Sequence, residues 1–339
     1  METRRITASV IIEGKDITQD IEQYNLSVSY TDVLEGESNT AQITLHDRER
    51  LFIADWFPHR GDSAQIILRK TNWAGENDSD SVDFGIFEID EIENKVSASS
   101  GNTASIKLNS IANKSELRSI DKSRSWEKVK LSKIARDLTE EAGMELFFDA
   151  DDVDIERAEQ KETSNLKFLH KLCRDNGLCL RVANNQVIIF DAERYEAKDA
   201  VKILTYGDEN IISFSGKATI SKIYKAAHVK YQHGKQAEKI DYTFDDPDKS
   251  DGMTLEINKR VESPAEAEKL AKKELRKKNQ SEIKVQLQVI GDFIYLAGQN
   301  IELADFGFYS GKYCIEKATH SVGKGYTCSL ELRRCLKGY

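Results

Sequence analysis

The sequence predicts an α+β, mainly β fold in which two similar β-barrel domains flank a small α/β module, with one helix inserted in the second barrel. Three observations lead to this prediction. Short segments with apolar residues at every second position fill both ends of the chain, as in strands with one buried face. These segments recur in the same order, as in a duplicated unit. Between them, apolar residues return at helical spacing.

The repeat consists of five pairs of similar segments. Residues 26–29 match 212–215, 41–45 match 227–231, 61–68 match 298–303, 85–90 match 311–316, and 103–108 match 327–332. The first two pairs share one offset, and the offset increases where one copy carries an insertion between strands. Five matches in the same order are harder to obtain by chance than a single match. We therefore expect one β unit to be used twice.

The length of 339 residues suggests two or three domains. We expect a first barrel at 1–113, an α/β middle module at 114–204 and a second barrel at 205–339. The strands expected in the first barrel are 9–12, 26–30, 41–45, 64–68, 84–91 and 103–109. The segment 71–81 between them is polar and acidic, so it is expected to be a solvated loop.

The middle module is expected to hold two helices and a hairpin. Leu131, Ile134 and Leu138 recur at helical spacing, and Gly143 follows where that helix would end. A second helix is expected to begin at Ser164, a good N-cap residue, and to end at Gly177. The strands 178–182 and 186–190 follow, joined by a tight turn that contains two asparagines.

The helix inserted in the second barrel is expected at 264–279, between the second and third repeated strands. Ser263 is a good N-cap, Pro264 suits the first helical position, and Glu266 completes a capping box. The helix carries many basic residues: Lys269, Lys272, Lys273, Arg276, Lys277 and Lys278. A solvated basic face supported by ion pairs is the favoured interpretation. A phosphate site and a partner with an acidic surface are the alternatives.

Composition and charge exclude several classes of protein. No window approaches the ~20 apolar residues of a membrane span, and the first residues lack the apolar core of a secretion signal. The net charge of −9 argues against a general nucleic-acid binder, which needs a basic surface. The five cysteines are expected to be reduced core residues. They are Cys173, Cys179, Cys314, Cys328 and Cys335.

No segment matches a known catalytic or metal-binding pattern, and we assign no catalytic, cofactor-binding or metal-binding residue. The acidic run 149–154 fails as a calcium loop because Asp154 and Gln160 occupy the positions that need Gly and Glu. The run 246–252 fails in the same way. The histidines are interpreted as surface or half-buried residues rather than zinc ligands. They are His46, His59, His170, His228, His233 and His320.

Several motifs together resemble a known family. They are Asp16-Ile17-Thr18, the segments 56–62 and 85–92, the helix 164–177 with Phe168, Leu169 and Gly177, and the pair 265–271 and 296–301. In this order they resemble the late control gene D proteins of phages, the baseplate hubs of contractile tails. They are more distantly similar to the hub portion of the type VI secretion spike protein. Asn165 stands where the family pattern has Asp.

The resemblance implies a structural protein, not an enzyme. It implies a homotrimer whose six tube-type barrels form a pseudo-sixfold ring, which adapts the sixfold tail tube to the threefold central spike. The implied partners are the spike protein, the tail tube protein or tube initiator, and other baseplate proteins. Neither membrane insertion nor specific nucleic-acid binding is expected, although DNA or tape-measure protein would pass through the lumen.

The resemblance further implies a virion or phage-like particle, assembled in the bacterial host cytoplasm. The spike is expected to be a separate polypeptide. Two alternatives remain open: a tail-associated cell-wall hydrolase and a receptor- or carbohydrate-binding tail module. The second predicts clustered exposed aromatic residues, whereas Trp56, Trp73 and Trp126 are scattered along the chain.

Overall fold

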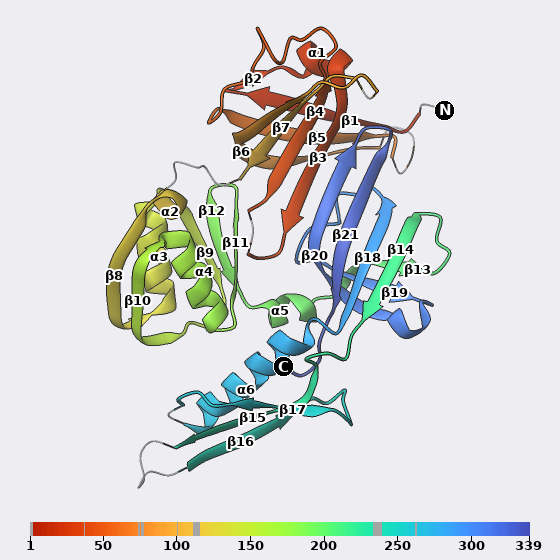
Figure 1. Ribbon diagram of the computed structural model, residues 1–339. Helices are drawn as coiled ribbons and strands as arrows, with labels where there is room; N and C mark the ends of the chain where they lie inside the picture. The colour runs from red at the N-terminus through yellow and green to blue at the C-terminus, as the bar shows by residue number, and fades with distance from the viewer. Residues whose placement is uncertain are drawn as a thin grey trace. The chain divides into compact units, whose positions relative to one another are not determined.

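The computed structural model describes residues 3–36, 38–73, 75, 78–99, 101–110, 116–232, 239–261 and 263–339 (Figure 1). Strands dominate, and helices accompany them, so the predicted α+β, mainly β fold class is confirmed. The chain forms two compact units. Unit 1 holds residues 1–192, 289–297 and 317–329, and unit 2 holds residues 193–288, 298–316 and 330–339. The division into domains at 113 and 204 stays a prediction, and the boundary at 113 lies outside the described residues.

The main sheet of unit 1 has the strand order β3-β4-β7-β6-β5-β1-β2, with antiparallel neighbours. The strands are β1 (Arg5–Ile12), β2 (Lys15–Asp16), β3 (Asn25–Val33), β4 (Thr40–His46), β5 (Ser63–Thr71), β6 (Ser79–Lys95) and β7 (Thr103–Asn109), with α1 (Thr18–Ile21) and a 3-10 turn (Glu22–Tyr24) between β2 and β3. Alternation decides which face is buried: Ala41, Ile43 and Leu45 of β4 point into the core. The register shifts after Gln65 and after Ile89, and such irregularities bend a sheet.

The main sheet of unit 2 has the order β14-β18-β21-β20-β19-β13. Its strands are β13 (Ala200–Thr205), β14 (Ile211–Ala218), β18 (Ile283–Ile290), β19 (Asn300–Ala304), β20 (Gly311–Val322) and β21 (Tyr326–Arg334). Strand for strand this repeats the order β3-β4-β7-β6-β5-β1. The sixth strands differ, because β1 is antiparallel to β5 whereas β13 is parallel to β19. The ends of β18 and β20 and the start of β21 belong to unit 1.

A shared pair of backbone hydrogen bonds supports the repeat. In unit 1, Gly61 N–H donates to Ile89 O at 2.8 Å, and Ile89 N–H donates to Asp62 O at 2.9 Å. In unit 2, Gly298 N–H donates to Ile315 O and Ile315 N–H donates to Gln299 O, both at 2.9 Å. The predicted matches of 61 with 298 and of 85 with 311 therefore hold in three dimensions.

One predicted match is wrong. The segment 227–231 lies in β15 (Tyr224–Gln232), which pairs with β16 (Lys239–Asp245) and β17 (Met253–Ile257) in a separate sheet. The counterpart of β4 is β18. The helix α6 (Pro264–Asn279) is therefore inserted between the first and second repeated strands, not between the second and third. Both segments alternate in the same way, and only the pairing of whole strands distinguishes them.

The small sheet and α6 form one layered insertion. Ala267, Ala271 and Leu275 of the helix are buried against Ala227 and Val229 of the sheet. The capping residues are as predicted: the Ser263 hydroxyl accepts from Glu266 N–H at 3.2 Å, and Pro264 is the first helical residue. Of the described helices, none has the length and apolar character needed to cross a membrane.

In the middle of the chain, the two longer helices, α3 and α4, pack on short sheets. The elements of this region are α2 (Glu116–Ser119), β8 (Asp121–Lys130), α3 (Leu131–Glu141), β9 (Glu145–Asp149), β10 (Asp154–Ser164), α4 (Asn165–Asp175), β11 (Cys179–Ala183), β12 (Gln186–Phe190) and α5 (Ala192–Ala197). The predicted helices and hairpin are present. Asn184 and Asn185 both have positive φ, as expected of the hairpin turn. The long ribbon formed by β8 and β10 was not predicted, because its charged segments lack apolar alternation.

Candidate functional site

The acidic runs serve the fold. Asp152 caps α3 by accepting from the backbone and the hydroxyl of Ser132, at 3.1 and 2.6 Å. Asp246 is buried and accepts from Asn279 Nδ2 at 3.0 Å and from the Tyr339 hydroxyl. Within the described ranges, no group of three or more His, Cys, Asp or Glu residues could hold a metal ion. All five cysteines lie in the described part of the chain and none forms a disulfide there; four are buried as expected, whereas Cys335 is only half-buried.

Two histidines form close hydrogen bonds. The prediction of a surface or half-buried position is wrong for His320, which is fully buried in unit 1 and whose Nε2–H donates to Tyr295 O at 2.8 Å. Its Nδ1 therefore accepts from the Tyr326 hydroxyl at 2.7 Å. Burial lowers the pKa of His320 and so favours the neutral ring. His228 instead lies between two carboxylates, at 2.7 Å from Asp241 and 2.8 Å from Glu256. His233 lies outside the described residues.

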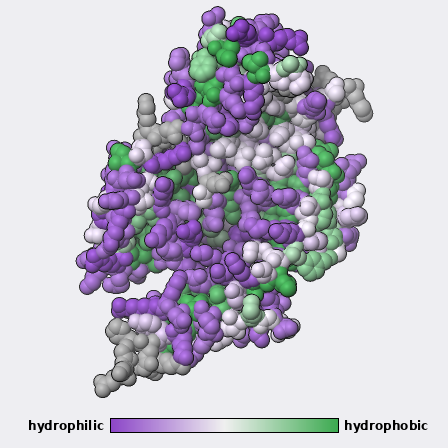
Figure 2. Space-filling model, viewed as in Figure 1, coloured by the Kyte–Doolittle hydropathy of each residue, from purple (hydrophilic) through white to green (hydrophobic). Residues whose placement is uncertain are grey.

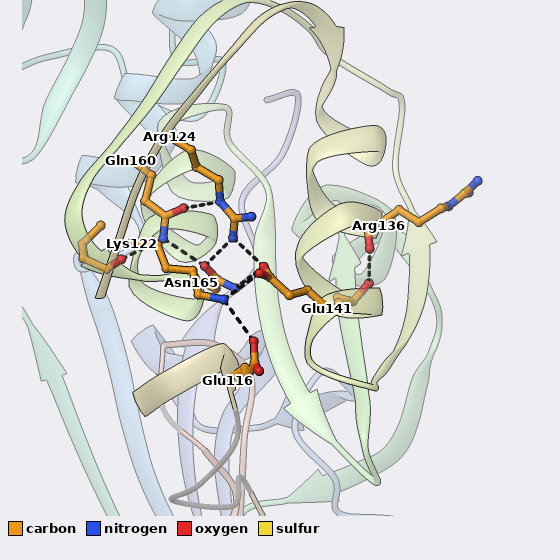
Figure 3. A network of polar contacts seen from close by, with 9 residues as sticks. Glu116, Lys122, Arg124, Arg136, Glu141, Gln160 and Asn165 are labelled. Atoms are coloured by element: carbon orange, nitrogen blue, oxygen red, sulfur yellow. Dashed lines mark hydrogen bonds and ion pairs between the residues drawn. The ribbon is translucent and has the colours of Figure 1, made fainter. Parts of the chain in front are cut away.

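A polar network joins the helices of the middle module to the ribbon β8–β10 (Figure 3). The Glu141 carboxylate at the end of α3 accepts from Lys122 and Arg124, both at 2.6 Å, and from Asn165 Nδ2 at 3.1 Å. Asn165 Oδ1 accepts in turn from Arg124 and from Gln160, at 2.8 and 2.9 Å. Asn165 thus donates and accepts at once. An aspartate here, as in the family pattern, would face Glu141 with a second negative charge.

Acid is expected to remove the contribution of this network to stability. Hydrogen bonds from Lys122 and Arg124 lower the pKa of Glu141 to about 2. A carboxyl group whose pKa is lower in the folded state stabilises it above the unfolded pKa, and this contribution disappears as the pH falls through the folded value. Urea unfolding of the wild type and of Glu141→Gln should therefore differ at pH 7 and converge towards pH 2. A difference that stays constant with pH would contradict this assignment.

A buried ion pair in unit 1 connects β3 with β11. Asp32 is 2% exposed, and one of its carboxylate oxygens accepts from Arg181 Nη2 at 2.8 Å. The other oxygen accepts from the backbone N–H of Ala297 at 2.9 Å. The Tyr30 hydroxyl donates to the first oxygen at 3.3 Å and accepts from Asn39 at 2.9 Å. These contacts satisfy the buried carboxylate and fix the loop before β19.

Unit 2 has a buried charge cluster of its own. Glu196 of α5 is 3% exposed and lies between Arg276 of α6, at 2.7 Å, and Arg333 of β21, at 2.9 Å. Glu196 Oε1 and Arg276 Nη2 form no hydrogen bond in the described structure, so attraction between the charges is the main interaction. One carboxylate thereby holds a strand and two helices together.

The edge of β14 is the strongest candidate for a functional surface. In unit 1 the end of β20 pairs with β3 and covers it. Strand β14, which has the position of β3 in unit 2, is the outermost strand of its sheet. Its Ile212 is 51% exposed. Figure 2 shows pale and green surface over the place of β14, where apolar groups meet solvent. An exposed edge with apolar side chains is a template for pairing with another strand.

Comparison with known proteins shows the fold. No protein-family model and no curated protein matches the chain. Among solved structures, it is similar to the 43 kDa tail protein of prophage MuSo2 from Shewanella oneidensis, with 14% identity, a TM-score of 0.75, and 98% of this chain and 99% of that chain covered. It is also similar to the tail protein from Neisseria meningitidis MC58, with 13% identity, a TM-score of 0.69, and 97% and 96% covered.

The chain is also similar to a protein of a secretion system. A component of the E. coli type VI secretion system, described as structurally similar to the T4 bacteriophage tail proteins gp27 and gp5, matches with 10% identity and a TM-score of 0.57. The match covers all of this chain and 79% of that one. The chain therefore has the baseplate hub-like fold of these tail and secretion proteins, and the resemblance found in the sequence is confirmed for the fold.

Proposed function

We propose that the chain is a structural baseplate hub protein of a contractile tail, in a phage, a tailocin or a related injection particle. The observation that supports this most is the repeat: two sheets with the same strand order within one chain. The full-length likeness to tail proteins agrees with it. Three such chains would present six similar units, and a ring of this kind adapts a sixfold tail tube to a threefold central spike.

The proposed partners follow from this role. They are two further copies of the chain, the central spike protein, the tail tube protein or tube initiator, and other baseplate proteins. The place of action is the tail baseplate of a virion or phage-like particle, assembled in the host cytoplasm. Contacts that close such a ring are heterologous, so two different surfaces of the chain must be complementary.

The arrangement of the three tryptophans does not favour a carbohydrate-binding module. The three tryptophans pack on separate aromatic neighbours instead of forming one platform. Trp126 stacks on Phe168, Trp73 lies against Tyr326, and Trp56 lies against Phe52 and Tyr24. The carboxylates of the two buried clusters are likewise engaged by cations. A cell-wall hydrolase would still be revealed by zymography of the purified chain.

Light scattering tests the proposal directly. We expect a solution mass of about three times 38.4 kDa, either for the chain alone or after mixing with its spike protein. The reason is that the outermost strands expose apolar groups that a closed ring would cover. A chain that stays monomeric at high concentration and in the presence of the spike protein would contradict the hub assignment.

A further inference from the structure

We infer that neighbouring copies of the chain join through the second half of β6 and strand β14. Residues 91–96 of one copy pair in antiparallel fashion with residues 214–219 of the next. This inference rests on the proposed ring and specifies its contact surface. It follows from the repeat, because the chain already contains one contact of the same kind.

The existing contact is the pairing of β20 with β3. Beyond Ile315, residues Lys317 to Val322 of β20 run antiparallel to residues Val33 to Val28 of β3. The hydroxyl groups of Thr319 and Thr31 lie 3.1 Å apart across this seam. The side chains of Val28 and Tyr30 are thereby buried. The first strand of one repeat, β3, thus pairs with the second half of the long strand of the other repeat, β20.

Each of these two strands has a counterpart in the other repeat. Strand β6 is the counterpart of β20, and their shared backbone hydrogen bonds align Ile89 with Ile315. The residues that correspond to 317–322 are therefore 91–96, which are the end of β6 and the one residue after it. Strand β14 is the counterpart of β3, and the match of 26–29 with 212–215 aligns residues 28–33 with 214–219. The same antiparallel pairing would now join two molecules.

Both edges are open in the described structure. Strand β6 pairs with β5 only as far as Glu88, and from there to Lys95 it pairs with β7 among the described strands. Strand β14 pairs with β18 at the end of its sheet. Exposure follows the same division. Val322 in the covered seam is 9% exposed, whereas its counterpart Val96, directly after the end of β6, is 76% exposed.

The side chains at the two edges are complementary in the transferred register. Glu93 takes the place of Thr319, and Lys217 takes the place of Thr31, so a carboxylate and an ammonium group meet where two hydroxyl groups meet within the chain. Val96 comes opposite Phe214. Opposite charges that face each other directly across two strands favour one register over its neighbours. In an interface they contribute more to specificity than to affinity.

Cysteine cross-linking tests the register. The variant Glu93→Cys/Lys217→Cys is oxidised with oxidised glutathione and analysed by non-reducing electrophoresis and mass. Directly opposed Cβ atoms are about 4.5–5.5 Å apart, close to disulfide range. We expect covalent multiples of the 38.4 kDa chain that reductant removes, at least about tenfold more abundant than with either single cysteine variant. The matched control is Thr31→Cys/Thr319→Cys, which should link within one chain at unchanged mass.

A charge exchange provides a second readout. Glu93→Lys and Lys217→Glu should each shift the oligomer towards monomer in light scattering, and the double exchange should restore it. If the wild type is oligomeric but the inter-chain disulfide is absent and neither reversal has an effect, the inferred edges are wrong while the hub proposal stands. If Glu93→Cys cross-links equally well with Ser213→Cys, the register is wrong. A wild type that is monomeric alone and with the spike protein contradicts both proposals.

Discussion

Replacement of Glu196 by alanine is expected to destabilise unit 2 by about 3–5 kcal/mol, because it leaves two buried guanidinium groups without their carboxylate. The side chains of Arg276 and Arg333 are only 11% and 4% exposed, so water cannot replace the lost partner. Each arginine retains one weaker interaction, because Glu316 lies 3.6 Å from Arg333 Nε and Arg276 Nη1 donates to Tyr339 O. Chemical denaturation monitored by circular dichroism measures the change.

A nearby control separates this effect from a general loss of charge. Glu302 of β19 is an exposed glutamate of the same unit, and its replacement by alanine should change stability by no more than about 0.5 kcal/mol. If the two variants lose the same free energy of unfolding, the buried ion pairs of Glu196 do not stabilise unit 2 more than an exposed carboxylate does. Since both lack one negative charge, the comparison isolates burial and pairing.

Replacement of Asp32 by alanine is expected to cost about 3 kcal/mol, since it removes one partner of a buried ion pair. Arg181 loses its carboxylate, and the backbone N–H of Ala297 loses its acceptor. An unsatisfied buried donor costs about 1–3 kcal/mol by itself. Urea unfolding of the purified variant gives the free energy change.

The asparagine variant separates the loss of the charge from the loss of the acceptor for Ala297 N–H. Asp32→Asn keeps an oxygen for Ala297 N–H and the approximate shape of the side chain, but it lacks the charge that pairs with Arg181. It should therefore lose less stability than Asp32→Ala. Equal losses would mean that the charge alone matters, and a greater loss for asparagine would contradict the role assigned to the backbone contact.

Local patterns predicted most of the strands and helices. The alternation in 41–45 and the capping residues at 263–266 act within a few residues, so they can be seen in one sequence. The match of 227–231 with 41–45 was wrong because any half-buried strand alternates in this way. The true counterpart, β18, contains Ile283, Val285, Leu287 and Val289 at alternate positions. That signal was available, but a long insertion separates it from β14.

The buried clusters could not be predicted from the sequence. Glu196, Arg276 and Arg333 lie far apart along the chain, and each is one charge among many in a sequence that is 32% charged. Only the packing of α5, α6 and β21 brings them together. The inferred pairing of β6 with β14 could be predicted only in part. The repeat was visible in the sequence, but the register could be assigned only from the observed pairing of β3 with β20.

The return of residues 289–297 and 317–329 to unit 1 affects how the protein is made. On the ribosome, the first 192 residues emerge long before the segments that complete their core. Until those segments appear, Tyr30 and Phe84 lack His320, which packs beside them in the finished fold. Contacts between such distant parts of a chain form slowly and leave apolar surface exposed in the meantime. We therefore expect nascent chains to need chaperone protection until almost the whole polypeptide has been synthesised.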